Sequence, residues 1–595
     1  MKQQSSNEYM NRDAAQVDDA VQNRMRHVHV RLRTSNLEWT APRTIISVIA
    51  VTAALCLMNS VPIHARSHQR PNQLSARKNG DGKESLEKAA ELLRAGKLLE
   101  AENTVRDLIK VDVRSSAAHT LLGVILYQRG NQAEAEQELR QGLRLNPKSV
   151  AALTNLAVLL SNTRRPDEAI ESLEAALRLA PDHREAQYDL AVLYVQAKRY
   201  DQAVSLLNRL IELTGGKDSA EVAVLLTLAS AYSGAHRLQD ANALADVIEK
   251  RSNNDARALF TLGLALADAG QYDRAVRLFE RTNKLRPNSY EVLYNLGLAL
   301  INVDQLPRAR AILQNAATAD PNQPDVFYRL GLIASAMGES ENALGLWQRT
   351  IMLRPQNPEV YFVMAEELVK NQRNERAIPF YETAVQQDST KPIFHIRLGV
   401  AYFRARRYAA AHESFAAAAK IFPQNGTLHY LVGYAARAEG QFDLAEKEFQ
   451  RSIDLDSNNA AAYANLGFLA VERGDQVEAE RLLRRALSLE PDNYPATYDL
   501  GRLLVRLKRY DEALLLLKRG TQLVKDDPGA HYQLFLVYSR LRSKPEAEQE
   551  LALFKKLEQS RKARESGADG SAVTQTLPPP DPVVTRSGEV QKEKP

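Results

Sequence analysis

An alanine that returns at a fixed spacing along this 595-residue chain constrains its fold more than any other feature of the sequence. Each step is 34 residues, except for the 38 residues from Ala203 to Ala241. The additional residues, 215–218, form a turn-like Gly-Gly-Lys-Asp stretch, where an insertion disturbs packing least. The alanines are Ala101, Ala135, Ala169, Ala203, Ala241, Ala275, Ala309, Ala343, Ala377, Ala411, Ala445, Ala479, Ala513 and Ala547. Such a period indicates a repeat array rather than separate globular domains.

Two further positions keep the same period and indicate the shape of each unit. A Gly or an Ala lies twelve residues before the alanine in every unit except the last, which has Phe535. Twelve residues after the alanine, seven units have a proline, which cannot continue the preceding helix and marks its end. Each unit therefore reads as two antiparallel helices, A and then B. The small residue of helix A faces the alanine of helix B, and stacking of neighbouring units buries the apolar faces.

This pattern resembles the tetratricopeptide repeat family over residues 82–561. Stretches such as Tyr294-Asn295-Leu296-Gly297 and Gly270-Gln271-Tyr272-Asp273-Arg274-Ala275 are similar to the family consensus. The resemblance implies an all-α fold, a right-handed superhelical solenoid of fourteen antiparallel helix pairs. It also implies that the A helices line a concave groove that binds protein or peptide ligands. The absence of alternating strand patterns agrees with an all-α chain.

The two ends of the chain differ from the repeats in composition. Residues 1–43 are polar and basic, residues 66–81 read as a polar linker, and residues 562–595 read as a disordered Pro-rich tail. The apolar run from Ile45 to Met58, inside residues 44–65, is shorter than the roughly 20 residues of a full membrane span. Residues 44–65 therefore predict a signal peptide or a membrane anchor, with possible attachment through residues 44–63. We expect an exported (periplasmic or cell-envelope) or membrane-anchored protein.

Few residues carry the chemistry of an enzyme. The only cysteine is Cys56, and no phosphate-binding glycine loop, zinc-binding helix or nucleophile elbow occurs. The sequence predicts no enzyme, no cofactor and no metal site. A net charge of +5 against 78 basic and 73 acidic side chains argues against a nucleic-acid partner. Four histidines, His119, His395, His429 and His531, share one position in helix A, where we interpret them as half-buried substitutes for an aromatic residue.

Two neighbouring positions of helix A supply the candidate binding residues. Rings recur three residues before the small residue, and amide or charged groups recur one residue later. The candidates at these positions are Tyr188, Asp189, Phe260, Tyr294, Asn295, Tyr328, Arg329, Phe362, Arg397, Tyr430, Asn465, Tyr498 and Asp499, and the groove also gains Arg404 and Arg437. Rings provide contact area and amides pair with an extended backbone, so these residues suit a peptide that combines apolar and acidic side chains. The alternative is that the rings serve packing and the polar groups are merely solvated.

The function that the sequence predicts is a scaffold for protein partners. Its groove would bind peptides or proteins, and the chain would be exported or tethered to a membrane. The alternative that stays open is an accessory subunit of a bacterial envelope assembly for secretion, pilus formation or polysaccharide export.

Overall fold

The computed structural model describes residues 73–567 of the chain. The basic segment 1–43, the signal or anchor segment 44–65 and most of the tail 562–595 lie outside this range. Within it, the chain forms the helices α3 to α30 and no strand, so the all-α prediction is confirmed. Odd-numbered helices are the A helices of the repeats and even-numbered helices are the B helices. In this part of the chain no helix has both the length and the apolar character needed to cross a bilayer.

The described residues divide into two compact units between Ile333 and Ala334. The first unit contains α3 (Gln73–Arg94), α4 (Leu98–Val111), α5 (Ser116–Gln128), α6 (Gln132–Leu145), α7 (Val150–Asn162), α8 (Pro166–Leu179), α9 (Arg184–Gln196), α10 (Tyr200–Leu213), α11 (Val222–Gly234), α12 (Leu238–Arg251), α13 (Ala256–Asp268), α14 (Tyr272–Leu285), α15 (Tyr290–Asn302) and α16 (Leu306–Ala319). Helix α17 (Pro324–Ala336) contains the division. The second unit contains α18 (Ser340–Leu353), α19 (Pro358–Lys370), α20 (Asn374–Gln387), α21 (Pro392–Arg404), α22 (Tyr408–Ile421), α23 (Gly426–Glu439), α24 (Phe442–Leu455), α25 (Ala460–Arg473), α26 (Gln476–Leu489), α27 (Tyr494–Arg506), α28 (Tyr510–Leu523), α29 (Pro528–Arg540) and α30 (Lys544–Gly567).

The structure differs from the sequence-based boundaries at both ends of the array. Helix α3 begins at Gln73, inside the segment 66–81 that reads as a linker. Helix α30 continues to Gly567, inside the tail that begins at residue 562. Once a helix has been nucleated and packed, each further residue adds one hydrogen bond, so a polar segment can extend it. The extra residues 215–218 lie between α10 and α11, where Gly215 and Gly216 have positive φ angles of 91° and 98°.

Local signals start several A helices and end every one of them. Several A helices begin behind a side-chain cap, as where the Ser149 hydroxyl accepts the N–H of Ala152 at 3.2 Å. Every A helix then ends at one residue with a positive φ angle, which reverses the chain into helix B. These residues are Gly96, Gly130, Arg164, Lys198, His236, Gly270, Asp304, Gly338, Gln372, Arg406, Gly440, Gly474, Lys508 and Arg542. A residue in the left-handed conformation is common at the C-terminal end of a helix. For a residue other than glycine, this conformation costs roughly 1 kcal/mol.

Close packing of A on B occurs at the repeated small residues. The recurring B-helix alanine is fully buried in every repeat from Ala101 to Ala513. Opposite it, a Cβ added to Gly399 would lie 2.6 Å from the ring of Phe415, and one added to Gly467 would lie 2.6 Å from Leu483. Real Cβ atoms do not come this close to their neighbours, so the glycine is required for the approach of the two helices.

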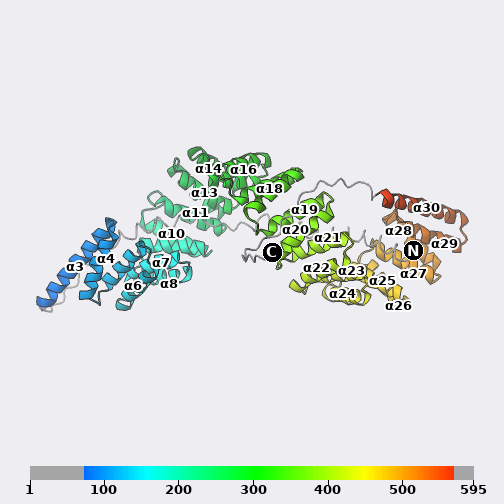
Figure 1. Cartoon of the computed structure of the whole chain (residues 1–595), viewed down its shortest axis with the longest axis horizontal. Coiled ribbons are helices and arrows are strands. Elements are labelled where there is room, and N and C mark those ends of the chain that lie inside the picture. Colours follow the sequence, from blue (N-terminus) through cyan, green and yellow to red (C-terminus); the bar gives the residue numbers. More distant parts are fainter. Residues whose placement is uncertain (1–72, 568–595) are drawn as a thin grey trace, which may run out of the picture. The chain divides into compact units, whose positions relative to one another are not determined.

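Successive helix pairs stack in sequence order within each unit (Figure 1). Most B helices contact their own A helix and the A helix of the next repeat, as α6 contacts α5 and α7. Some successive A helices also contact each other directly, as α11 contacts α9 and α13, and as α27 contacts α25 and α29. The repeats are therefore closer together along their A helices, which places these helices on the concave side of each stack.

Three of the four aligned histidines form the same polar bridge. In His119, Nδ1 lies 2.6 Å from the Glu138 carboxylate on helix B, and Nε2 lies 3.1 Å from the carbonyl oxygen of Val113 in the preceding loop. His429 and His531 repeat both contacts, with Glu448 and Glu550 as their B-helix partners. These histidines therefore tie helix A to helix B and to the preceding loop. In the sequence, a glutamate nineteen residues after each of these three histidines could have indicated the bridge.

The fourth histidine lacks this glutamate, which gives a test of the bridge. His395 bonds the carbonyl oxygen of Ser389, but Ser414 stands where the other repeats have glutamate and donates instead to Ala410 of its own helix. Replacing Ser414 by glutamate should stabilise α21 and α22 by about 1 kcal/mol, the net value of one hydrogen bond. Hydrogen exchange of the amides in these helices measures the change. Glu448→Ala is the converse variant and should weaken α23 and α24. Faster exchange in the Ser414→Glu protein would show that the bridge is not stabilising.

Candidate partner-binding surface

The face of the A helices that carries the candidate residues is here termed the inner surface. Five of these residues, Asn295, Arg397, Asn465, Tyr498 and Asp499, are buried, each at most 8 % exposed. The other ten are half-buried: Tyr188, Asp189, Phe260, Tyr294, Tyr328, Arg329, Phe362, Arg404, Tyr430 and Arg437. The surface is thus made of side chains that are fixed by packing and expose only part of their atoms.

The rings of the inner surface rest on rings of their own repeat. Phe260 lies 5.6 Å from Phe279 of helix B, measured between ring centroids. Phe362 and Tyr430 make the same contact with the aromatic residue of their own B helix, at 5.8 Å in both cases. Such pairs are stabilising beyond the area that they bury. The rings therefore serve packing on one side and leave a second side at the inner surface, so the two interpretations from sequence are compatible.

The amide groups use their nitrogen atoms within their own helices. Nδ2 of Asn295 donates to the carbonyl oxygen of Glu291 at 2.8 Å, and Nδ2 of Asn465 donates to that of Ala461 at 2.8 Å. Oδ1 of both residues is buried and accepts no hydrogen bond from the described residues. Because these oxygens are buried, a ligand backbone could pair with them only after the side chains rearrange.

Tyr188 and Asp189 lie together at the inner surface of the first unit. The Tyr188 hydroxyl is 3.4 Å from that of Thr227 on the next A helix, α11, so this contact joins two repeats. Burial, and to a smaller extent the charge of Glu185 one turn earlier, raise the pKa of the Asp189 carboxyl from 3.8 to about 7. The carboxyl of Asp189 is thus held in an environment that disfavours its charged form.

Asp189→Asn should stabilise the first unit at high pH. An acid with a raised pKa in the folded state costs stability as the pH rises from its unfolded value of 3.8 to about 7. Asparagine has no such cost, so the advantage of the variant should grow by at least about 1 kcal/mol between pH 4 and pH 8. Urea unfolding at a series of pH values measures it. Asp182→Asn, at an exposed residue paired with Arg209, is the control. An advantage that does not change with pH would contradict the prediction.

In the second unit, side chains of successive A helices form a continuous row. Phe403 of α21 lies 5.0 Å from Tyr434 of α23, between ring centroids. The guanidinium carbon of Arg437 is 5.2 Å from the centroid of Tyr434 and 4.9 Å from that of Phe468 on α25. The Arg437 side chain is therefore stacked between the rings of two neighbouring repeats. Sequence analysis identified Arg437 but neither of these rings, although Tyr434 and Phe468 are 34 residues apart.

Ion pairs continue this row on either side. Nε of Arg397 lies 3.3 Å from Glu366 of α19. Arg502 of α27 lies 3.3 Å from Glu472 of α25 and 3.2 Å from Asp499 of its own helix. These contacts bring two predicted residues, Arg397 and Asp499, together with partners that the sequence analysis did not identify. The charges of Arg397 and Asp499 are each balanced by an opposite charge within the chain.

Two stretches of A helices, one in each unit, differ in charge. From α9 to α15, their charged residues are Arg184, Glu185, Asp189, Arg257, Asp268 and Glu291, which leaves an acidic excess. From α21 to α27, apart from histidines, they are Arg397, Arg404, Arg437, Glu439, Glu472, Arg473, Asp499, Arg502 and Arg506, which leaves a basic excess. These two stretches of the inner surface are therefore suited to ligands of different charge.

The B helices carry ion networks between neighbouring repeats. Arg165 bonds both Glu136 and Glu168, and Arg140 bonds the same two carboxylates. The hydrogen bond from Arg165 lowers the pKa of Glu168 below its usual value. The same four-residue network recurs in the second unit, with Glu480, Arg484, Arg509 and Glu512 in the equivalent places. These charges act between repeats, and the exposed pairs contribute little stability each.

Comparison with known proteins agrees with the repeat. Models described as tetratricopeptide repeat match residues 86–150, 138–171, 163–220, 226–282, 266–330, 328–392, 396–460 and 470–534. No curated protein matches the sequence.

Similar solved structures include several proteins of low sequence identity. The hetero-tetramer of Cut9 and Hcn1 from the APC/C matches at 17 % identity, over 79 % of this chain and 92 % of that chain, with a TM-score of 0.35. The C-terminal part of a TPR repeat-containing protein from Cytophaga hutchinsonii matches at 18 % identity, over 40 % and 99 %, with a TM-score of 0.37. Yeast Tom70 matches at 16 % identity, over 77 % and 99 %, with a TM-score of 0.27. On its period, its helix pairs and the family models that match most of its length, this chain belongs to the tetratricopeptide repeat family.

Proposed function

We propose that the protein is an interaction scaffold that binds peptide or protein partners along the inner surface of its A helices. The observation that carries this proposal is the row of aromatic and charged side chains that continues from one A helix to the next, from the buried rings of Phe403 and Tyr434 to the half-buried Arg437 and Phe468. Rings held by packing lose little entropy when a ligand binds, and aromatic and arginine side chains are frequent anchors at interfaces.

A panel of selected peptides tests the inner surface. Peptides would be selected from a random display library on the immobilised full chain, and their affinity measured by fluorescence anisotropy. Tyr294→Ala combined with Tyr328→Ala should cost peptides that bind the first unit about 2 kcal/mol or more of binding free energy. The matched control is Leu99→Ser combined with Val111→Ser, at exposed apolar residues of the outer helix α4. Loss of binding in the control, with full affinity in the tyrosine variant, would place the partner on the B helices and refute the proposal.

The scaffold is further proposed to be exported or held at a membrane. The support is the apolar run from Ile45 to Met58, preceded by the basic residues Arg31, Arg33 and Arg43. Mass spectrometry of the native protein distinguishes the two forms, because cleavage predicts a start near Arg66 and an anchor predicts an intact chain in the membrane fraction. An intact chain in the soluble cytosolic fraction would contradict both.

A further inference from the structure

We propose that a cavity on the B-helix side of the first unit binds a partner segment in which an aliphatic side chain stands next to an acidic one. The cavity has a volume of about 410 Å³ and lies between the B helices α14 and α16, over the A helix α15. Sites for small ligands have volumes of about 300–1,000 Å³. None of the residues that line the cavity is a candidate residue of the inner surface, so the inference concerns a second site.

The cavity has an apolar floor and a polar, exposed rim. Leu296 and Leu300 of α15 are at most 2 % exposed and form the floor, and the half-buried Ile312 of α16 lines the cavity as well. Lys284 of α14 and Arg308 of α16 are exposed and line the rim from the two B helices. An apolar side chain that enters the cavity would therefore lie among leucine and isoleucine side chains, while the neighbouring residues of the partner stay close to the charged rim.

At this cavity Asn283 of α14 departs from the pattern of the repeats. Eight residues after the recurring alanine of helix B, eight other repeats have an aliphatic side chain that is buried or half-buried. These residues are Ile109, Leu143, Leu177, Ile211, Ile351, Val385, Ile453 and Leu487. Asn283 places an amide there, and its Oδ1 is buried without a hydrogen-bond partner among the described residues. A buried polar atom without a partner destabilises a fold, so packing alone does not explain this asparagine.

Two donors of the cavity are open to a ligand. Nδ2 of Asn283 makes no hydrogen bond with the described residues and, unlike Oδ1, it is not buried. Lys284 is exposed and forms no ion pair with the described residues. Arg308, in contrast, is paired with Glu280 of α14 at 2.5 Å, so these two charges balance each other and the charge of Lys284 remains. An ammonium group and an amide N–H both donate to carboxylate oxygens, so this side of the cavity suits an acidic side chain.

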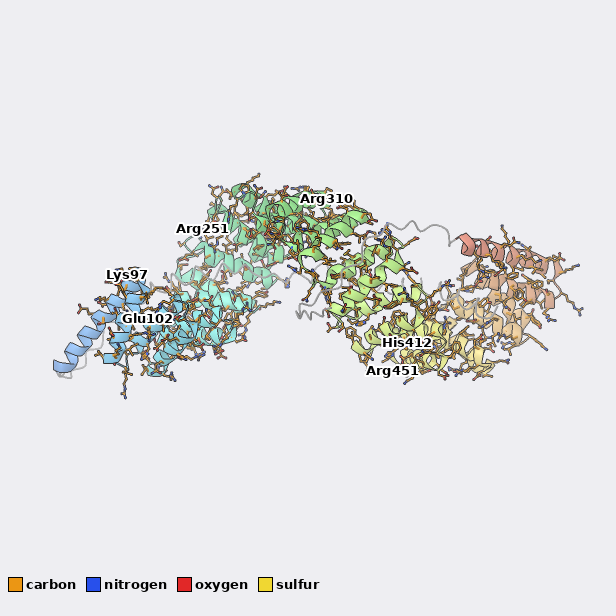
Figure 2. All side chains as sticks on the ribbon, viewed as in Figure 1. Lys97, Glu102, Arg251, Arg310, His412 and Arg451 are labelled. Carbon is orange, nitrogen blue, oxygen red and sulfur yellow. The ribbon has the colours of Figure 1, made fainter. Side chains whose placement is uncertain are left out.

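The charge of the surrounding helices favours the same ligand. Helices α14 and α16 carry Arg274, Arg277, Arg281, Lys284, Arg308 and Arg310 (marked in Figure 2), against Asp273 and Glu280. Arg274 and Arg281 pair with acids of α12, whereas Arg277 and Lys284 form no ion pair with the described residues. A basic surface attracts an acidic segment. The partner is therefore a protein segment with an aliphatic side chain for the floor and Asp or Glu beside it for the rim.

Two selections with the same random peptide library test the inference. One uses the full chain and the other uses the Ala311→Phe chain, in which a ring at an exposed residue of the cavity occupies its space. Peptides that combine Leu, Ile or Val with a neighbouring Asp or Glu should be enriched on the parent chain and lost from the variant. By fluorescence anisotropy, the most enriched of these peptides should bind Ala311→Phe at least about tenfold more weakly. Circular dichroism shows whether this variant remains folded.

Two further variants separate binding from folding. Asn283→Leu restores the aliphatic side chain of the other repeats, so it should slow hydrogen exchange in α14 to α16 and yet weaken the selected peptide by about tenfold. Lys284→Gln should weaken the peptide several-fold, and more strongly at low salt than at high salt. The matched control is Lys420→Gln, at the equivalent exposed residue of α22, and it should leave the affinity unchanged.

The outcomes distinguish this site from the inner surface. Weaker binding by Asn283→Leu and Lys284→Gln, with full affinity in Lys420→Gln, would establish the site. If Ala311→Phe binds every enriched peptide fully, or if the peptides that it loses contain no acidic residue, the inference is wrong, whereas the proposed function of the inner surface is unaffected. Equal losses in Lys284→Gln and Lys420→Gln would show attraction to basic charge in general and would also overturn the inference. Slower exchange in Asn283→Leu with unchanged affinity would exclude the amide from the site and contradict the inference as well.

Discussion

Replacing Phe449 by alanine is expected to destabilise the helix pair α23–α24 by about 3–5 kcal/mol, the usual cost of truncating a buried aromatic side chain to alanine. Phe449 is completely buried. On helix A its ring lies against Gly433, where an added Cβ would be 2.9 Å away, and 5.8 Å from the ring of Tyr430. Alanine would leave a cavity between the two helices, because their backbones are already held close by Gly433 and Ala445 and cannot move together to fill it.

Hydrogen exchange read by mass spectrometry measures this loss locally. In a solenoid each repeat contacts mainly its neighbours, so the exchange of α23 and α24 should accelerate while that of the distant pair α5–α6 stays unchanged. Phe422→Ala is the matched control, because Phe422 is 55 % exposed and its truncation should cost less than about 0.5 kcal/mol. Equal effects of Phe449→Ala and Phe422→Ala would contradict the packing described here. Acceleration throughout the chain would contradict the local nature of the array.

Gly399→Leu is expected to cost about 3 kcal/mol, at the upper end for an overpacked core. A Cβ at this position would lie 2.6 Å from the ring of Phe415, and the leucine would add three further carbon atoms. The helices would have to separate or the ring leave its place. The control is Gly345→Ala on helix α18, where an added Cβ meets no atom within 4 Å. That change should stabilise the helix by up to about 1 kcal/mol, since alanine is the better helix former.

The same contact can be tested by enlarging the side chain on helix A while making the opposing side chain on helix B smaller. Some repeats that have alanine in place of Gly399 have an opposing side chain smaller than Phe, as in the pairs Ala157 with Leu173 and Ala191 with Leu207, whereas Ala365 faces Tyr381. Gly399→Ala should be better tolerated when combined with Phe415→Leu, because the added Cβ would lie 2.6 Å from the Phe415 ring. A coupling free energy of about 0.5–3 kcal/mol between the two changes is expected from a double-mutant cycle by urea unfolding. Additive effects of the two changes would mean that these side chains do not meet.

The sequence by itself determined the helix pairs, their order and the residues at which A packs on B. These features repeat with the same period, because each repeat needs a small residue wherever two backbones approach. The same pattern therefore occurs in almost every repeat of the sequence. It also identified the face of the A helices on which Arg437 and the recurring rings lie. It did not determine which of these side chains are buried, because the exposure of Asn465 or Tyr498 depends on the neighbouring repeats as well as on its own position.

Only the tertiary structure decided the features that depend on a meeting between different helices. The left-handed residue that ends each A helix is not confined to glycine, since Arg164 and Lys198 adopt it where the helix pair demands a reversal. The bridge from His119 to Glu138 and the stack of Arg437 on Phe468 join side chains of different helices. The type of a residue determines which bonds it is able to form, whereas the packing of helix pairs determines which partner lies within reach. The polar contacts of the inner surface therefore became apparent only in the folded chain.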